Sequence, residues 1–198
     1  MLEQEKYSII YADPPWQFNN VKTGGSLKSG AESKYMTTSI EDLKAMDVNS
    51  IAADDALLVM WWVGSMPQEA IDLVKAWGFT LKNMNGIVWN KLTAKNNPHF
   101  GMGFYTRAGS ESCLIATKGK FKPASRSVRA VFRAEEQIQF EGKILSHSEK
   151  PKQVRELIVE LAGDLPRLEM FNRDDSWAVF GNESKNSIAI NKKKPLNN

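Results

Sequence analysis

The segment Ala56–Val63 constrains the fold of this chain most strongly, because its sequence, ALLVMWWV, is apolar at every position. An uninterrupted apolar run of this length is typical of a strand that is buried on both faces of a sheet. Tyr7–Ala12 predicts a second strand near the N-terminus. Further strands are predicted within Leu81–Lys91 and over Glu111–Thr117, Arg167–Asn172 and Trp177–Phe180.

Helix signals lie between several of these strands. Thr38 and Glu41 form a capping-box pattern, which opens a helix, and the two later helices open at a proline and close at a glycine. The three predicted helices run from Thr38 to about Met46, from Pro67 to Gly78 and from Pro151 to Gly163. Buried strands that alternate with helices predict an α/β layered domain.

The length of 198 residues suits one domain of this kind. We place the domain at residues 1–184 and expect the basic end, residues 185–198, to be a disordered tail. No signal peptide is visible, and no segment approaches the ~20 apolar residues that span a membrane, so a cytoplasmic protein is expected. Because the chain has a single cysteine and two histidines, neither a disulfide framework nor a metal site is expected.

The strand Tyr7–Ala12 runs directly into an acid, two prolines and a tryptophan, Asp13–Trp16. Proline lacks the backbone N–H but keeps its carbonyl, so this turn is stiff and offers acceptors rather than donors. Ligands of α/β sheets gather at the carboxyl ends of strands, where this turn lies. A carboxylate and a carbonyl can accept both protons of a nucleobase amine, while Trp16 can stack on the base. The turn therefore favours chemistry on an exocyclic amine, by positioning and electrostatics.

Basic residues gather in segments that contain no acid. Residues 112–134 lack Asp and Glu, and so do residues 14–31. Such segments suit a phosphate backbone, although a solvated basic surface explains them equally well. The candidate phosphate contacts in these two segments are Lys22, Lys28, Lys120, Lys122 and Arg126.

From about Tyr7 to Glu183 the sequence resembles the MT-A70 family of adenine methyltransferases. The resemblance is carried by an ordered set of blocks: YADPPW at 11–16, KYMTTS at 34–39, LLVMWWV at 57–63, WGF at 77–79, IVWNK at 87–91, GSESCLIATKG at 109–119, SHSEKP at 146–151 and LEMFNRDDSWAVFGNE at 168–183. It implies a Rossmann-like methyltransferase sheet in permuted order, with helices on both faces and the catalytic strand ahead of the cofactor-binding strand.

The resemblance also implies roles for individual residues. The catalytic turn corresponds to Asp13, Pro14, Pro15 and Trp16. The residues that border the pocket for the substrate base are Tyr35, Trp62, Trp89 and Glu111. The cofactor site comprises Asp13, Lys150, Phe171, Arg173, Asn182 and Glu183, where Lys150 matches a lysine that contacts the cofactor's carboxylate.

Several of these assignments have plain structural alternatives. Trp62 also suits the core, and the phase of the strand decides whether Trp61 or Trp62 faces the site, because neighbouring side chains point to opposite faces. Lys150 is also compatible with an ordinary residue ahead of a helix, although a lysine there opposes the helix dipole. The chain departs from the family's pattern at Asn172, where many members have a small residue. General methyltransferase sequences carry a Gly-x-Gly loop after the cofactor strand, and none follows residues 168–172 here.

The activity implied is site-specific transfer of a methyl group from S-adenosylmethionine to N6 of adenine in DNA. DNA is preferred because the chain resembles the small prokaryotic and phage members of the family. A duplex target would have to flip its adenine into the pocket. Two alternatives stay open: the same reaction on adenosine in RNA, and a non-catalytic nucleic-acid-binding subunit of a methyltransferase complex. Methylation of an amine in protein is disfavoured, because related turns there begin with asparagine and end with tyrosine.

Overall fold

The computed structural model describes residues 5–17, 38–101, 103, 105–135, 150–171, 177–181 and 188–193. The strands are β1 (Tyr7–Ala12), β2 (Ala52–Trp62), β3 (Thr80–Leu92), β4 (Ser110–Lys118), β5 (Val131–Glu135), β6 (Arg167–Met170) and β7 (Ala178–Phe180). The helices are α1 (Ile40–Ala45), α2 (Val48–Ile51), α3 (Pro67–Ala76) and α4 (Gln153–Ala162).

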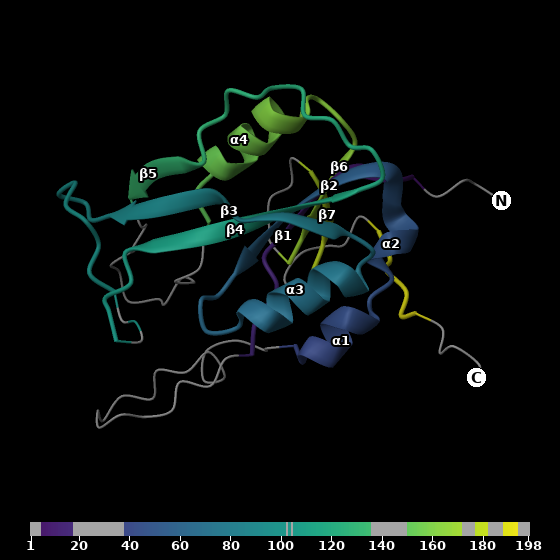
Figure 1. Ribbon diagram of the computed structural model, residues 1–198, viewed down its shortest axis with the longest axis horizontal. Coiled ribbons are helices and arrows are strands. Elements are labelled where there is room, and N and C mark those ends of the chain that lie inside the picture. The colour runs from purple at the N-terminus through teal and green to yellow at the C-terminus, as the bar shows by residue number, and fades with distance from the viewer. Residues whose placement is uncertain are drawn as a thin grey trace.

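The strands form one sheet, in the order β5-β3-β4-β2-β1-β6-β7. β4 is antiparallel to its neighbours β2 and β3, and the remaining pairings are parallel. β1 therefore lies inside the sheet, where Tyr11 is paired with Val59 of β2 on one side and with Glu169 of β6 on the other. This pairing brings the beginning of the chain beside a strand from near its end (Figure 1).

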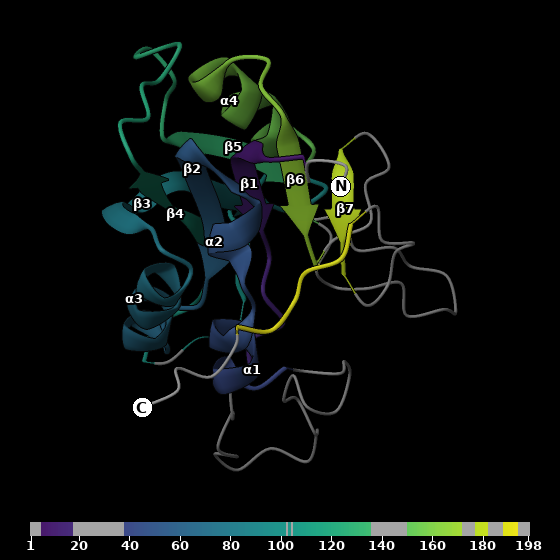
Figure 2. The same cartoon turned by 90° about the vertical axis from the view of Figure 1, so that its right-hand side faces the viewer.

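An apolar layer covers each face of the sheet, so the expected α/β fold with helices on both faces is confirmed. One layer joins Ile10 of β1 to Leu43 of α1 and Leu73 of α3, and the other joins Ile9 of β1 to Ile158 of α4. Figures 1 and 2 show α4 on one side of the sheet, with α1 and α3 on the other. Successive residues of β1 enter opposite layers, as strand geometry requires. Each such side chain, when fully buried, stabilises the fold by about 1.5–3 kcal/mol.

Helix α1 begins one residue later than the capping-box pattern predicts. Ser39 is the N-cap, because its backbone is extended and its hydroxyl accepts a hydrogen bond from the backbone N–H of Asp42 at 3.1 Å. The prediction that Thr38 caps this helix is therefore wrong. Thr38 instead forms a bridge to Trp16, and its N–H donates to the carbonyl of Pro15 at 3.2 Å. The backbone of Thr38 is thus used to hold the turn after β1.

The ends of the other two long helices agree with the proline and glycine signals. Pro67 is in the first turn of α3, and Gly78 follows that helix with a positive φ of 85°. Helix α4 begins at Gln153, two residues after Pro151, and closes at Gly163, whose φ is 88°. Both glycines adopt a backbone conformation that costs other residues more.

Two segments differ from the sequence-based description. β5 lies in a segment expected to be a loop and pairs with β3 at the edge of the sheet. Only Ala134 of β5 is buried, so the strand carries no apolar pattern that reveals it. Residues 188–193, placed in the expected tail, pack along the α1 side of the domain. There the N–H of Asp47 donates to the carbonyl of Asn191 at 2.9 Å, and Ile190 packs on the apolar layer.

Candidate active site

The carboxyl ends of β1 and β6 meet where the direction of the connections changes. The chain leaves β1 for α1 and α2 on one face of the sheet, whereas α4, on the other face, leads into β6. Ligands of open α/β sheets bind at such topological switch points. The N–H of Asp13 donates to the carbonyl of Met170 at 3.1 Å, so the turn after β1 is fixed to the end of β6.

Backbone hydrogen bonds hold the turn Asp13–Trp16 in shape. The carbonyl of Pro14 accepts from the N–H of Trp16 at 2.8 Å, and the carbonyl of Pro15 accepts from Thr38. The indole N–H of Trp16 donates to the carbonyl of Trp61 at 3.1 Å, which ties the turn to the end of β2. A carbonyl oxygen has two lone pairs, so Pro14 keeps one for a ligand.

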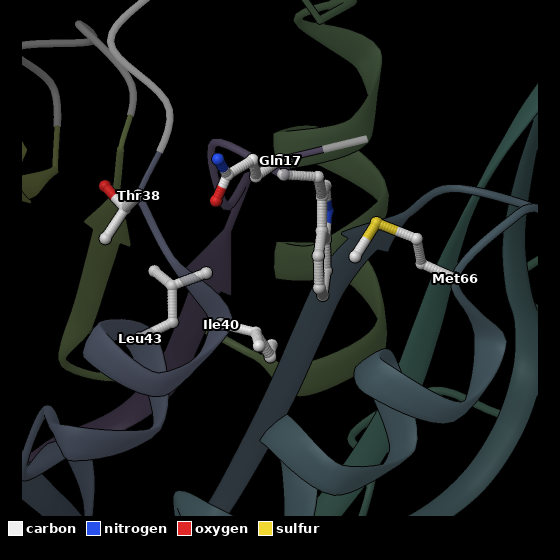
Figure 3. A pocket seen from close by; sticks show the side chains of 6 residues that line it. Gln17, Thr38, Ile40, Leu43 and Met66 are labelled. Atoms are coloured by element: carbon white, nitrogen blue, oxygen red, sulfur yellow. The ribbon is translucent and has the colours of Figure 1, made fainter. Parts of the chain in front are cut away.

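The ring of Trp16 is buried on the α1 face of the sheet. It lines a small pocket of about 60 Å³ together with Gln17, Thr38, Ile40, Leu43 and Met66 (Figure 3). Only 6% of Trp16 is exposed, and the residue belongs to the apolar layer that contains α1 and α3. The structure therefore places this ring as an anchor of the turn, and its stacking on a base stays a prediction.

Four charged side chains form a continuous chain beside the turn. The ammonium of Lys150 lies 3.0 Å from a carboxylate oxygen of Asp13 and 3.5 Å from one of Glu111. The second oxygen of Glu111 lies 2.6 Å from the ammonium of Lys91. Lys150 is buried, with 9% of its side chain exposed, and Asp13 is nearly so. Charges taken out of water need such partners, because an unpaired buried charge is costly.

Two tryptophans form the floor of this cluster. Lys150 lies 5.3 Å from the ring of Trp61, Lys91 lies 4.7 Å from the ring of Trp89, and the two rings meet edge to face at 6.5 Å. Their indole N–H groups donate to the hydroxyl of Tyr11 and the carbonyl of Ala134, at 2.7 Å and 2.9 Å. The aromatic faces attract the cations, and the hydrogen bonds fix the rings.

The pKa values of the cluster are shifted by burial and by mutual pairing. Burial raises the pKa of Asp13, and Lys150 offsets only part of this rise. Burial alone would raise the pKa of Glu111, but Lys150 and Lys91 outweigh it and lower that pKa. Burial alone would lower the pKa of Lys150, but Asp13 and Glu111 outweigh it and raise that pKa. Lys150 is thus a permanent cation, whereas Asp13 is held closer to protonation.

Strand register explains why these residues meet. Trp89 of β3 is paired with Glu111 of β4, and Trp61 of β2 is paired with Cys113, two residues further along β4. Residues two apart share a face of a sheet, so Lys91 lies on the same face as Trp89. Burial raises the pKa of the Cys113 thiol well above its usual value, which leaves this residue as a protonated core residue.

The structure brings together Asp13, Trp89, Glu111 and Lys150 from the predicted site, but not Trp62. The indole N–H of Trp62 donates to the carbonyl of Met84 at 2.8 Å, and its ring packs on the opposite apolar layer. Trp61 occupies the position expected for Trp62. Sequence reasoning named Trp61 only as the alternative and missed Lys91, although the two-residue spacing from Trp89 places Lys91 on the same face.

Phe171 lies directly after β6, at the expected cofactor side. Its backbone has a positive φ of 69°, and its N–H donates to the carbonyl of Phe180 at 2.6 Å. Gly181 approaches so closely that a β-carbon there would lie 3.0 Å from the α-carbon of Phe171. The ends of β6 and β7 are therefore pressed together beside the switch point.

Six predicted site residues lie outside the described residues: Lys22, Lys28, Tyr35, Arg173, Asn182 and Glu183. The other predicted phosphate contacts lie far from Asp13. The N–H of Lys120 donates to Asp55 at 2.6 Å, near the start of β2, and the rise of that strand from Asp55 to Trp62 is about 23 Å. The following segment crosses α4, where the N–H of Ala124 donates to Leu161. Lys120, Lys122 and Arg126 as phosphate contacts stay a prediction.

Neither a metal site nor a membrane span is found in the part of the chain that the structure describes. Its His, Cys, Asp and Glu side chains form no group of three or more that could hold a metal ion. None of its helices is long and apolar enough to cross a membrane.

The sheet order, the helices on both faces and the site at the carboxyl ends of β1 and β6 define a Rossmann-like methyltransferase fold. The model of the MT-A70 family matches residues 7–183, and the chain belongs to this family. It is 34% identical to the type II methyltransferase M.MunI of Mycoplasma sp, over 90% of this chain and 79% of that protein.

More distant relatives are much longer than this chain. An N(6)-adenosine-methyltransferase MT-A70-like protein of Drosophila melanogaster is 24% identical, and the matched part covers 27% of its length. The human N(6)-adenosine-methyltransferase catalytic subunit METTL3 is 22% identical, and 28% of its length is covered. The match therefore spans 90% of this chain but only about a quarter of the length of those relatives.

Proposed function

We propose that this protein transfers a methyl group from S-adenosylmethionine to N6 of adenine in DNA, at specific sites. The observation that carries the proposal is the cluster at the carboxyl end of β1. It combines the acceptor-rich turn Asp13–Trp16 with a buried cation, Lys150, that holds the carboxylate of Asp13 at 3.0 Å. Family membership and the 34% identity to a type II methyltransferase support the same reaction class.

Asp13 and Pro14 are the groups that would hold the target amine. The carboxylate accepts one N6 proton and the Pro14 carbonyl accepts the other, which directs the nitrogen lone pair away from the ring plane. Lys150 and the hydrogen bond from the N–H of Asp13 to Met170 keep the carboxylate in place. Such prearranged groups act by positioning and by stabilising the charge that develops on the nitrogen.

Proton removal follows the formation of the new N–C bond. The methylated amine is positively charged and much more acidic than the neutral amine, so a weak base suffices to accept its proton. Burial raises the pKa of Asp13, which makes its carboxylate a better acceptor than an exposed aspartate. Asp13 thus combines two roles, first as the hydrogen-bond acceptor and then as the acceptor of the released proton.

Glu111, Lys91 and the two tryptophan rings form the wall against which the adenine would lie. The buried rings of Trp61 and Trp89 lie beneath Lys150 and Lys91 and support them, whereas Glu111 is half-exposed, with 35% of its side chain accessible. The carboxylate of Glu111 is held ionised by two lysines. Since Asp13 and Pro14 would take both N6 protons, and the ring nitrogens of adenine are acceptors, Glu111 would act by positioning Lys91, whose ammonium can donate to a ring nitrogen.

The described residues fit S-adenosylmethionine as the methyl donor. When bound, this cofactor supplies an electrophilic methyl group on a sulfonium. Lys150 is the buried cation that would meet the cofactor's carboxylate, and Phe171 directly follows β6, whose end is bonded to Asp13. The carboxylates of Asp13 and Glu111 suit a neighbouring positive charge. Arg173, Asn182 and Glu183 are proposed as further cofactor contacts on the strength of the family's motif.

DNA is proposed ahead of RNA because the more similar of the reported relatives is named a type II methyltransferase. The relatives named as adenosine methyltransferases are less similar, at 22–24% identity. The cluster around Asp13 would contact only the base and not the sugar, so RNA is the second candidate.

The test is a competition between substrates. The purified protein is incubated with S-adenosylmethionine and an equal mixture of DNA duplexes, DNA single strands and RNA oligonucleotides, and methylated nucleosides are quantified after digestion. We expect N6-methyldeoxyadenosine to predominate. If only RNA is methylated, RNA replaces DNA as the proposed substrate. If no oligonucleotide is methylated, the result supports the non-catalytic alternative.

A further inference from the structure

The connection between β3 and β4, described at residues 93–101, 103 and 105–109, forms a hairpin on the wall of the candidate active site. It begins just after Lys91 and ends just before Glu111, whose side chains pair at 2.6 Å. Its base is closed by the hydrogen bond from the N–H of Lys91 to the carbonyl of Gly109 at 2.9 Å. Figure 1 shows this connection at the left-hand end of the sheet, extending beyond β3 and β4.

Two aromatic side chains of the hairpin are turned into solvent. Phe100 is 75% exposed, and Tyr105 is fully exposed. Tyr105 also has a left-handed backbone, with φ at 60°, which is unfavourable for a residue with an aromatic side chain. The paired backbones of Gly101 and Ala108, with hydrogen bonds of 2.7 Å and 3.2 Å, brace the hairpin on either side of it. The structure thus holds an aromatic ring outward at some conformational cost.

The charged side chains that the hairpin itself contributes are positive. The sequence contains no Asp or Glu between Asp72 and Glu111, whereas the hairpin carries Lys95 and Arg107. The guanidinium of Arg107 lies 5.0 Å from the ring of Phe100, so a cation and an aromatic face are presented together. Phosphates meet cations and bases stack on aromatic faces, which makes nucleic acid the partner that suits both features.

We infer that the hairpin is the arm with which this protein grips nucleic acid beside the target adenine. Phe100 and Tyr105 stack on bases next to the target, and Lys95 and Arg107 contact phosphates. The inference rests on the proposed function, which it extends from the adenine to its neighbours. The chain from Glu111 to Tyr105 spans at most about 20 Å, so the rings stay within reach of bases that flank an adenine held at Asp13. In a duplex, such a ring fills the space that a flipped base leaves.

The test separates stacking from charge. Binding of a fluorescent mixed-sequence DNA duplex of about two helical turns is measured by anisotropy at several salt concentrations, without cofactor. Replacing Phe100 and Tyr105 together by Ala should raise Kd at least about tenfold and leave the salt slope unchanged, since stacking releases few counterions. Replacing Lys95 and Arg107 together by Gln should raise Kd and flatten the slope by about two units.

Two controls accompany these variants. Leu165→Ala removes another exposed apolar side chain, located just before β6 at the opposite end of the sheet, and should leave Kd unchanged. Phe100→Trp with Tyr105→Trp retains stacking surface and should keep Kd within about threefold of the wild type. Thermal unfolding of all four variants should match the wild type, because the changed side chains are exposed.

The inference is overturned if the alanine pair binds DNA as tightly as the wild type. It is also overturned if size-exclusion chromatography shows a wild-type dimer that the alanine pair dissociates while DNA binding is unchanged, since the hairpin would then hold a second copy. The assay contains no methyl transfer, so its outcome is separate from that of the proposed function. Hairpin-dependent binding without methylation would contradict only the proposed reaction.

Discussion

The two ends of the sheet use the same residue types for different purposes. At the carboxyl end, the buried ammonium of Lys150 lies between the carboxylates of Asp13 and Glu111. At the amino end, the ammonium of Lys118 donates to the carbonyls of Asn49 and Ala52 at 3.2 Å and 3.3 Å. There Asp55 is exposed and accepts from a backbone N–H, that of Lys120.

The two ends differ in the groups with which their charged side chains pair. At the amino end, side chains pair with backbone groups of α2, of the start of β2 and of the turn after β4, which is a structural task. At the carboxyl end, charges are removed from water and satisfy one another, which shifts their pKa values and fixes their positions. Shifted pKa values in a cluster at a switch point indicate a functional site. Charge composition alone does not distinguish the two ends, whereas burial does.

The largest contrast is expected between two aspartates. Asp13→Ala should lower the turnover number about 10²–10³-fold, because the group that holds the target amine is lost. Asp55→Ala at the amino end should leave it within about twofold. Turnover is measured with saturating S-adenosylmethionine and DNA, and calorimetry checks that the cofactor still binds. An Asp13→Ala variant that keeps more than a tenth of the wild-type turnover would remove Asp13 from the proposed role.

The second contrast is between two lysines and concerns stability. Lys150→Met leaves two carboxylates beside an apolar side chain, so the free energy of unfolding should fall by about 3 kcal/mol. Lys118→Met removes hydrogen bonds nearer the surface and should cost about 1 kcal/mol or less. Urea unfolding at neutral pH measures both. The additional change Asp13→Asn in Lys150→Met should restore part of the lost stability, and equal losses for both single lysine variants would contradict the contrast.

A third contrast, between basic residues near the two ends of the sheet, concerns how far the bound nucleic acid extends. Lys122 and Arg126 were predicted from the sequence as phosphate contacts, yet they follow the turn at the amino end. If the hairpin 93–109 is the main arm, Lys122→Ala with Arg126→Ala should flatten the salt slope of DNA binding less than the paired changes at Lys95 and Arg107. Anisotropy titrations at several salt concentrations measure the slopes. A larger effect of the first pair would indicate that the nucleic acid wraps towards the amino end.

The smallest expected effect is a shift in pH dependence. Activity requires ionised Asp13, whose pKa is raised by burial above the ordinary value of 3.8, so kcat/KM should fall as the pH drops through this raised pKa. The charge of Glu111 contributes to the rise. Glu111→Gln should therefore move the acid limb of the kcat/KM profile to lower pH. A limb that moves upward in this variant would contradict the electrostatic coupling of the two carboxylates.

The sequence predicted the site best where a pattern has a single structural meaning. The strand Tyr7–Ala12 and the turn after it were placed correctly, because an apolar run that ends at Asp-Pro-Pro leaves few other conformations. The choice between Trp61 and Trp62 was not possible, because a strand buried on both faces has no alternation to reveal its phase. Only the pairing of β2 with β4 decides that Trp61 faces the charged cluster.

Residues joined across strands were harder to predict. Lys91 enters the site through its ion pair with Glu111, and a lysine near the end of a strand such as β3 carries no signal of such a partner. Likewise, the sequence showed that the segment 112–134 lacks acids, but not that its turn at Lys118–Gly119 lies at the amino end. The antiparallel direction of β4 determines that location. Long-range register is therefore the information that the local pattern lacks.

The most direct measurement of the central claim is the position of the transferred methyl group. The protein is incubated with a DNA duplex and S-adenosylmethionine that carries a trideuterated methyl group, and the digested nucleosides are separated and identified by mass spectrometry. We expect the label on N6 of deoxyadenosine with the wild type, and its loss with Asp13→Ala. Label on a ring nitrogen of adenine or on cytosine, or equal labelling by the Asp13→Ala variant, would contradict it.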